Sequence, residues 1–140
     1  TIANEDLINA AKEARANAYN VYSNYRVGAA IVDDRGHLHV GCNVENASYG
    51  LTLCAERNCL AHGVAGGEKS FLAIVIYTGQ ETLTPPCGAC RQVIAEFMGA
   101  KAPVMAVNHL GEQKIWTVQE LLPDAFTPQN LAESSNKDMN

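Results

Sequence analysis

Apolar residues recur along the chain in two ways, at the spacing of a helix face and in short continuous runs that are typical of strands. The first helical pattern follows Asn4, which can cap a helix whose first turn carries Glu5 and Asp6. Its apolar positions are Leu7, Ile8, Ala11, Ala14, Ala18 and Tyr22. We therefore predict an amphipathic helix over residues 4–22.

A β-hairpin is predicted next. Residues 27–32 form an apolar run, the charged turn sequence 33–36 follows, and residues 37–42 alternate between polar and apolar side chains. The stretch 53–64 has helical composition and ends at the glycine pair 66–67, which can stop a helix. The first half of the chain is thus expected to contain two helices and a hairpin.

The second half predicts a strand, a helix and another strand. Residues 71–77 are almost entirely apolar, the prolines 85–86 break the chain, a helical pattern covers 87–98, and 103–107 is again apolar. This order favours a parallel pair of strands, whereas the hairpin is antiparallel, so we expect a mixed sheet and an α/β fold. The last predicted elements are a short strand around 115–117 and a brief helix over 118–122.

Length and composition indicate one domain. The chain has 140 residues, of which 47% are hydrophobic, and a chain of this size buries about two thirds of its unfolded surface around a single core. After Phe126 the sequence becomes polar, rich in Asn, Ser, Gln and Lys. We expect a single domain over residues 1–126 and a loosely held polar tail over 127–140.

The net charge and the aromatic content restrict the kinds of partner that the chain is expected to bind. The formal net charge is −5 and aromatic residues make up 6% of the chain, so there is neither a basic footprint for a phosphate backbone nor many rings on which bases could stack. Runs long enough for a membrane span and the features of a signal peptide are both missing from the sequence. A cytoplasmic protein that binds neither a nucleic acid polymer nor a membrane is expected.

Five cysteines in such a protein favour a role other than disulfide formation. Cys87 and Cys90 form a Cys-x-x-Cys pair, and Cys54 begins the sequence Cys-Ala-Glu-Arg. Cys42 and Cys59 have no comparable neighbours, so we expect both to be small core residues.

Cys54 and Cys87 stand at the predicted starts of helices, where unpaired N–H groups and the helix dipole stabilise a thiolate. Together with Cys90 they could hold Zn²⁺ at three corners of a tetrahedron and leave the fourth open for water, as in a catalytic site. Glu56 would then serve as general acid and base. Arg57 could donate hydrogen bonds to the thiolates and offset their negative charge.

The Cys-x-x-Cys pair alone leaves two other readings, a redox dithiol or half of a structural zinc site. A structural site needs a fourth ligand, and the available residues show no second ligand-pair spacing: Cys42, Cys59, His37, His39, His62 and His109. Cys-Ala-Glu followed by Pro-Cys-Gly-Ala-Cys is more specific, since it matches a general zinc-deaminase pattern of three thiolates and a glutamate that is not a ligand.

The sequence resembles the small, homotetrameric cytidine deaminases. Five blocks in one order carry the resemblance: residues 22–30, 41–50, 54–57, 86–92 and 120–126. It implies a three-layer α/β/α sandwich with a mixed five-stranded sheet. It also implies one zinc ion per chain and a homotetramer with active sites at the subunit interfaces.

The resemblance further implies how a nucleoside would be bound. Asn43 and Glu45 would hold the ribose hydroxyls, Tyr25 would stack on the base, and backbone N–H groups near Ala55 would meet the pyrimidine carbonyl. Tyr49 and Phe126 would reach the site of a neighbouring subunit. For the three aromatic residues, ordinary core packing is the competing interpretation, and Asn43 to Asn46 would otherwise be read as a polar loop.

These expectations combine into a hypothesis of hydrolytic deamination of cytidine and 2′-deoxycytidine to the uridines and ammonia, in pyrimidine salvage. A related aminohydrolase for a nucleoside antibiotic, a free base or a modified pyrimidine is the first alternative. An editing deaminase would need a basic groove, which the net charge of −5 disfavours. A non-catalytic zinc-stabilised module would have no use for Glu56 or for an open zinc position.

Overall fold

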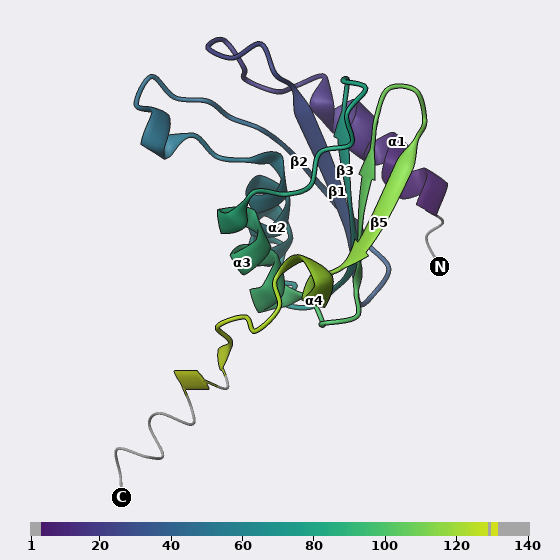
Figure 1. The fold of residues 1–140 in the computed structure, drawn as a ribbon, viewed down its shortest axis with the longest axis vertical. Coiled ribbons are helices and arrows are strands. Elements are labelled where there is room, and N and C mark those ends of the chain that lie inside the picture. The colour runs from purple at the N-terminus through teal and green to yellow at the C-terminus, as the bar shows by residue number, and fades with distance from the viewer. Residues whose placement is uncertain (1–3, 129, 132–140) are drawn as a thin grey trace, which may run out of the picture.

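A computed structural model describes residues 4–128, 130 and 131 of the chain. In this part of the chain one five-stranded sheet has the order β2-β1-β3-β4-β5 (Figure 1). The strands are β1 (Val27–Asp33), β2 (Leu38–Cys42), β3 (Phe71–Thr78), β4 (Pro103–Val107) and β5 (Gln113–Thr117). The helices are α1 (Asn4–Arg15), the short 3₁₀ helix η1 (Tyr49–Leu51), α2 (Ala55–Ala65), α3 (Gly88–Phe97) and α4 (Val118–Leu121).

The predicted mixed sheet is confirmed. β1 and β2 form the expected antiparallel hairpin, and β1 also pairs with β3 in antiparallel orientation. β3 and β4, which are joined through α3, run parallel. β5 closes the other edge of the sheet as an antiparallel neighbour of β4.

Helices cover both faces of the sheet, so the predicted three-layer sandwich is also confirmed. Alternate residues of β1 divide between two apolar clusters: Ala30 and Val32 pack with Leu7 and Ala11 of α1. Ala29 and Ile31 pack on the opposite face with residues of α2, α3 and α4. This alternation follows from the two-residue period of a strand.

Two glycines let helices approach the sheet closely. A Cβ added to Gly28 in β1 would lie 1.9 Å from the carbonyl oxygen of Ala11 in α1. A Cβ on Gly41 in β2 would lie 2.4 Å from the backbone nitrogen of Cys59 in α2. Any larger residue at either position would push a helix away from its strand, and at Gly41 that helix is the one that follows Cys54.

The first helix is shorter than predicted. It ends at Arg15, and Ala18 and Tyr22, which the pattern placed on its apolar face, lie beyond it. The physical reason is a competing tertiary pairing: Tyr19 forms a bridge with Val44 and donates its N–H to the carbonyl oxygen of Asn43. Ala18 is nevertheless buried, because the chain packs back onto the domain at this point.

The other predicted elements lie within one or two residues of their expected positions, and the prediction for the two remaining cysteines is partly met. Cys59 is fully buried in α2, whereas Cys42 is half-buried at the end of β2. Among the described residues, no helix has the length and apolar character needed to cross a membrane. Most of the predicted polar tail lies outside the described residues, but at its start Thr127 donates its N–H to Asn130 in a local turn.

Candidate metal centre and active site

The starts of α2 and α3 bring the cysteine motifs together. Cys54 is the N-cap residue of α2 and Cys87 is the N-cap residue of α3, and neither side chain caps its own helix. The two helices lie next to each other on one face of the sheet (Figure 1). The unpaired N–H groups of both helices therefore face the region where the sulfur atoms meet.

Three sulfur atoms converge there. The Sγ atoms of Cys54 and Cys87 are 3.8 Å apart, those of Cys87 and Cys90 are 3.3 Å apart, and all three lie within 4.8 Å of one another. A tetrahedron with zinc–sulfur bonds of about 2.3 Å has edges of about 3.8 Å. The donor set and its spacing fit a zinc ion held by these three residues.

The surroundings of the sulfur atoms favour a thiolate. Hydrogen bonding from the Cys90 thiol, aided by Arg57, lowers the pKa of Cys54 to about 5 despite its partial burial. The same hydrogen bond and burial raise the pKa of Cys90, so the proton shared by these cysteines stays there. The guanidinium group of Arg57 lies beside Cys54, with Nη2 3.5 Å from the Cys54 sulfur and 3.4 Å from the carbonyl oxygen of Thr52.

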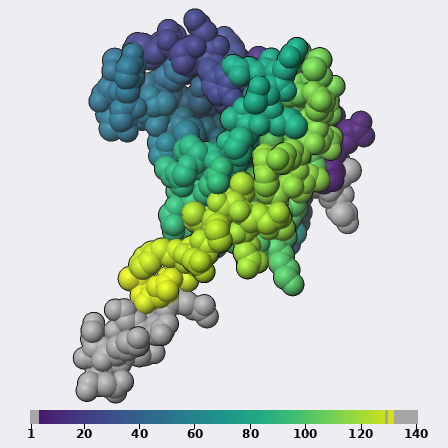
Figure 2. Space-filling view, in the orientation of Figure 1, coloured from purple at the N-terminus to yellow at the C-terminus, as the bar shows by residue number. Residues whose placement is uncertain are grey.

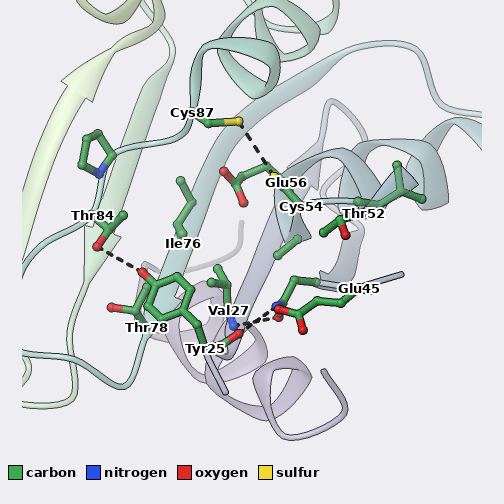
Figure 3. Close-up of a pocket in the computed structure, with 14 residues that line it drawn as sticks. Tyr25, Val27, Glu45, Thr52, Cys54, Glu56, Ile76, Thr78, Thr84 and Cys87 are labelled. Atoms are coloured by element: carbon green, nitrogen blue, oxygen red, sulfur yellow. Dashed lines mark hydrogen bonds between the residues drawn. The ribbon is translucent and has the colours of Figure 1, made fainter. Parts of the chain in front are cut away.

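Glu56 lies in the first turn of α2 beside the cysteines. It is 5% exposed, and burial raises the pKa of its carboxyl group above the ordinary value. Figure 3 shows its carboxylate next to Cys54 and Cys87, on the side that faces the cavity. Burial favours the protonated form of this carboxyl group, and its place beside the sulfur atoms suits a general acid and base.

A cavity of about 240 Å³ opens in front of this group (Figure 3). Cys54 and Cys87 line it together with Glu56, and so do Asn43 and Glu45. The other lining residues are Tyr25, Val27, Thr52, Leu53, Ala55, Ile76, Thr78, Thr84 and Pro85. The structure thus brings most of the sequence-predicted site residues to one cavity, with Arg57 directly behind Cys54.

The side chains of Asn43 and Glu45 line the cavity and also form hydrogen bonds with other residues of the chain. The Asn43 side chain accepts the Val27 N–H at 2.9 Å and donates to the Tyr25 carbonyl oxygen at 2.8 Å. Glu45 accepts hydrogen bonds from the Tyr22 N–H, the Ser23 N–H and the Ser23 hydroxyl group. The hydroxyl bond is the largest cause that keeps the pKa of Glu45 below its ordinary value. Both side chains are therefore fixed in orientation.

Three threonines in the cavity wall, Thr52, Thr78 and Thr84, were not singled out from the sequence. Thr84, in the connection between β3 and α3, accepts a hydrogen bond at 3.2 Å from the Tyr25 hydroxyl group. Thr78, at the end of β3, is 2% exposed and its Oγ1 has no hydrogen-bond partner among the described residues. The two-residue period of β3 could have predicted that Thr78, which pairs with Val27, faces the cavity. No local sequence pattern indicates that Thr84 does.

Tyr49 and Phe126 lie outside the cavity of their own chain. Tyr49 is 75% exposed in η1, on a segment that projects from the body of the molecule (Figure 2). Phe126 is 60% exposed in the chain that leads away from α4 (Figure 1). The core-packing interpretation is therefore wrong for these two residues, whereas Tyr25 is half-buried and lines the cavity.

Comparison with known proteins decides the family. The family model described as the cytidine and deoxycytidylate deaminase zinc-binding region matches residues 2–107. The chain belongs to this family. The family model describes a zinc-binding region, and three sulfur atoms converge in this chain. These two findings together indicate a zinc cofactor.

Relatives in this deaminase family resemble the chain over nearly its whole length. A cytidine deaminase of Sporosarcina psychrophila is 42% identical over 95% of this chain and 98% of its own. The crystal structure of a cytidine deaminase from Burkholderia pseudomallei superposes with a TM-score of 0.86 and 45% identity, over 89% of this chain and 100% of the other. For the cytidine deaminase of Mycobacterium tuberculosis the TM-score is 0.79, at 38% identity over 90% of this chain and 98% of the other.

Proposed function

We propose that the protein hydrolyses cytidine and 2′-deoxycytidine to uridine and 2′-deoxyuridine, with release of ammonia. One observation carries the proposal: the buried carboxyl group of Glu56 lines the same cavity as Cys54 and Cys87, whose sulfur atoms form a metal-competent cluster with that of Cys90. A closed structural zinc site would have no such cavity, and a redox dithiol would not need Glu56. The names of the relatives support the same substrate, because each is a cytidine deaminase.

Cys54, Cys87 and Cys90 would hold the zinc ion, which activates the attacking water when bound. Glu56 takes a proton from this water and delivers it to N3 of the pyrimidine ring, which makes C4 more electrophilic. The oxygen of the water bonds to C4, and Glu56 takes the remaining proton from this oxygen and transfers it to the amino nitrogen as the bond between that nitrogen and C4 breaks. Water and cytidine are consumed, uridine and ammonia are formed, and Glu56 returns to its starting state.

The remaining wall residues orient the nucleoside. The N–H groups at the start of α2, near Ala55, are free to donate to the pyrimidine carbonyl oxygen, since Cys54 does not cap the helix. Tyr25 presents its ring to the base. Asn43 and Glu45 bind the ribose hydroxyls. The amide and the carboxylate can each form further hydrogen bonds in addition to those that they make within the chain.

We also propose a homotetramer in which the exposed Tyr49 and Phe126 complete the cavity of a neighbouring subunit. The support is that both side chains are exposed and belong to segments that extend away from the sheet and its covering helices (Figure 1). A cytoplasmic role in pyrimidine salvage is part of the same proposal, because thiolate zinc ligands persist in a reducing compartment. Sedimentation analysis should give about four times the chain mass of 15.0 kDa.

The deciding experiment is an assay of the purified protein with cytidine, followed by ultraviolet absorbance and by released ammonia, together with zinc analysis. We expect turnover of cytidine and 2′-deoxycytidine, and one zinc ion per chain. Free cytosine tests the related-aminohydrolase alternative, since it lacks the ribose that Asn43 and Glu45 would bind. Full zinc occupancy without turnover, or faster turnover of cytosine than of cytidine, would contradict the proposal.

A further inference from the structure

A hydrogen bond joins two cavity residues that come from distant parts of the chain. The Tyr25 hydroxyl group donates to Thr84 Oγ1 at 3.2 Å (Figure 3). Tyr25 lies between α1 and β1, whereas Thr84 lies between β3 and α3, and both residues are half-buried and line the cavity. The bond therefore connects the tyrosine ring to the segment that leads to the cysteines of α3.

We propose that Thr84 is a positioning residue for the substrate, because its hydroxyl group fixes the Tyr25 ring against which the pyrimidine packs. This role rests on the proposed function, in which Tyr25 presents its ring to the base. Thr84 acts through Tyr25 and not through contact with the nucleoside. The base then meets a preformed surface, which raises affinity because less side-chain freedom is lost when the nucleoside binds.

The backbone of Tyr25 is already held on both sides by hydrogen bonds. Its N–H donates to Ser23 Oγ at 3.1 Å, and its carbonyl oxygen accepts from the Asn43 side chain at 2.8 Å. These contacts leave the side-chain torsions of the tyrosine unconstrained, so the direction of the ring depends on a further contact. Within residues 4–128, the bond to Thr84 is the one hydrogen bond that the Tyr25 side chain makes.

Thr84 offers its hydroxyl group from a stiff segment. The next two residues are Pro85 and Pro86, whose rings fix their own φ angles, and a residue that precedes proline is restricted to extended conformations. Pro86 is fully buried, and its carbonyl oxygen accepts a hydrogen bond from Arg91 Nε at 2.8 Å. A partner on such a segment can hold the tyrosine ring in one place.

The hydroxyl groups form a chain with one direction. Tyr25 donates to Thr84, and the Thr84 hydroxyl group donates to the carbonyl oxygen of Thr82 at 3.4 Å. A threonine hydroxyl group has one proton and two lone pairs, so it can fill both roles at once. Thr84→Val keeps the shape of the side chain and removes both hydrogen bonds, whereas Thr84→Ser keeps the hydroxyl group. These two changes separate the effect of the hydroxyl group from that of the side-chain shape.

The test is steady-state kinetics of the zinc-loaded protein with cytidine. Thr84→Val should raise KM about 3- to 10-fold, the usual effect of losing one neutral hydrogen bond. It should leave kcat within about twofold, because the ring contacts the base equally before and during the reaction. Tyr25→Phe removes the other partner and should have the same effect. Thr84→Ser should keep KM within about twofold of the unmodified protein, a rescue that a purely structural role of the methyl group would not give.

A double-mutant cycle shows whether the two hydroxyl groups act through each other. If they do, the variant with both Tyr25→Phe and Thr84→Val should raise KM no further than either single change. Thr82→Val and Tyr77→Phe are the matched controls, since Thr82 is exposed in the same connection and Tyr77 packs with α1 on the other face of the sheet. Both controls should have the KM of the unmodified protein.

Thr84 has no such role if Thr84→Val has the KM of the unmodified protein, or if Thr84→Ser raises KM as much as Thr84→Val does. Single effects that multiply in the double variant would also overturn it, because Thr84 would then act through its contact with Thr82. An unmodified protein that does not turn over cytidine would overturn the proposed function and this role with it. Zinc analysis and thermal unfolding of each variant verify that the metal centre and the fold are retained.

Discussion

The Arg57 guanidinium lies 3.5 Å from the sulfur atom of Cys54, one turn earlier in the same helix. Three thiolates around Zn²⁺ leave a net negative charge, and this contact places a fixed positive charge beside it. Arg57→Gln should therefore lower zinc affinity about 10- to 100-fold, the usual cost of losing a partner of a metal ligand. Competition with a chromophoric chelator measures this affinity.

Arg26→Gln is the control for this change, because Arg26 contacts the Ala16 carbonyl oxygen away from the cysteines. It should leave zinc affinity unchanged. Equal zinc affinity in both variants would mean that Arg57 has no part in holding the metal.

Glu56→Gln tests the proton-transfer step. Glutamine keeps the shape of the buried side chain but cannot accept and return a proton, so kcat for cytidine should fall about 10²- to 10⁴-fold. Zinc content and thermal stability should be retained. Glu96→Gln, an exposed change on α3, should keep full activity, and comparable kcat values for the two variants would rule out general acid and base catalysis by Glu56.

Glu45 should give substrate binding a defined pH dependence. Hydrogen bonds from Ser23 lower the pKa of Glu45, so the binding-competent carboxylate persists as the pH falls until that lowered pKa is reached. Ser23→Ala removes the hydroxyl donor and raises the pKa, and KM for cytidine should then begin to rise at a higher pH than in the unmodified enzyme. Steady-state kinetics across the acidic range measure this shift.

Glu45→Gln completes the test of substrate binding. It should raise KM at least about tenfold and remove the acidic rise, because no carboxylate remains to titrate. The interpretation would be wrong if Ser23→Ala and the unmodified enzyme had superimposable KM profiles.

Gly41→Ala should disturb both the fold and the metal site. The new methyl group would lie 2.4 Å from the Cys59 nitrogen and 2.8 Å from the Ala55 carbonyl oxygen, both backbone atoms of α2. Overpacking of this kind costs about 1–3 kcal/mol of unfolding free energy, and displacement of α2 should also weaken zinc binding. Urea unfolding measures the loss.

Gly99→Ala is the matched control, because a Cβ there meets no atom within 4 Å. It should change the unfolding free energy by less than about 0.5 kcal/mol. Equal stability of the two variants would show that α2 can move away from β2 at no cost.

Local patterns predicted most elements because each has strong signals of its own. The hairpin has alternating residues around a charged turn, α2 has Gly66 as its C-cap residue, and β3 is apolar along most of its length. The end of α1 was missed, since the apolar spacing continues to Tyr22 while the backbone of Tyr19 pairs with Val44. The spacing of apolar residues contains no information about this long-range pairing between Tyr19 and Val44.

The sequence by itself determined the metal-ligand chemistry. Cys54 and Cys87 each begin a helix, so the local sequence already couples a sulfur ligand to a helix N-terminus, and Glu56 and Arg57 follow on fixed positions of the same turn. Only the tertiary structure decided which other residues line the cavity beside them. Thr84 joins the cavity wall through its contact with Tyr25, which is distant in sequence, and a side-chain contact of that kind leaves no periodic pattern along the chain.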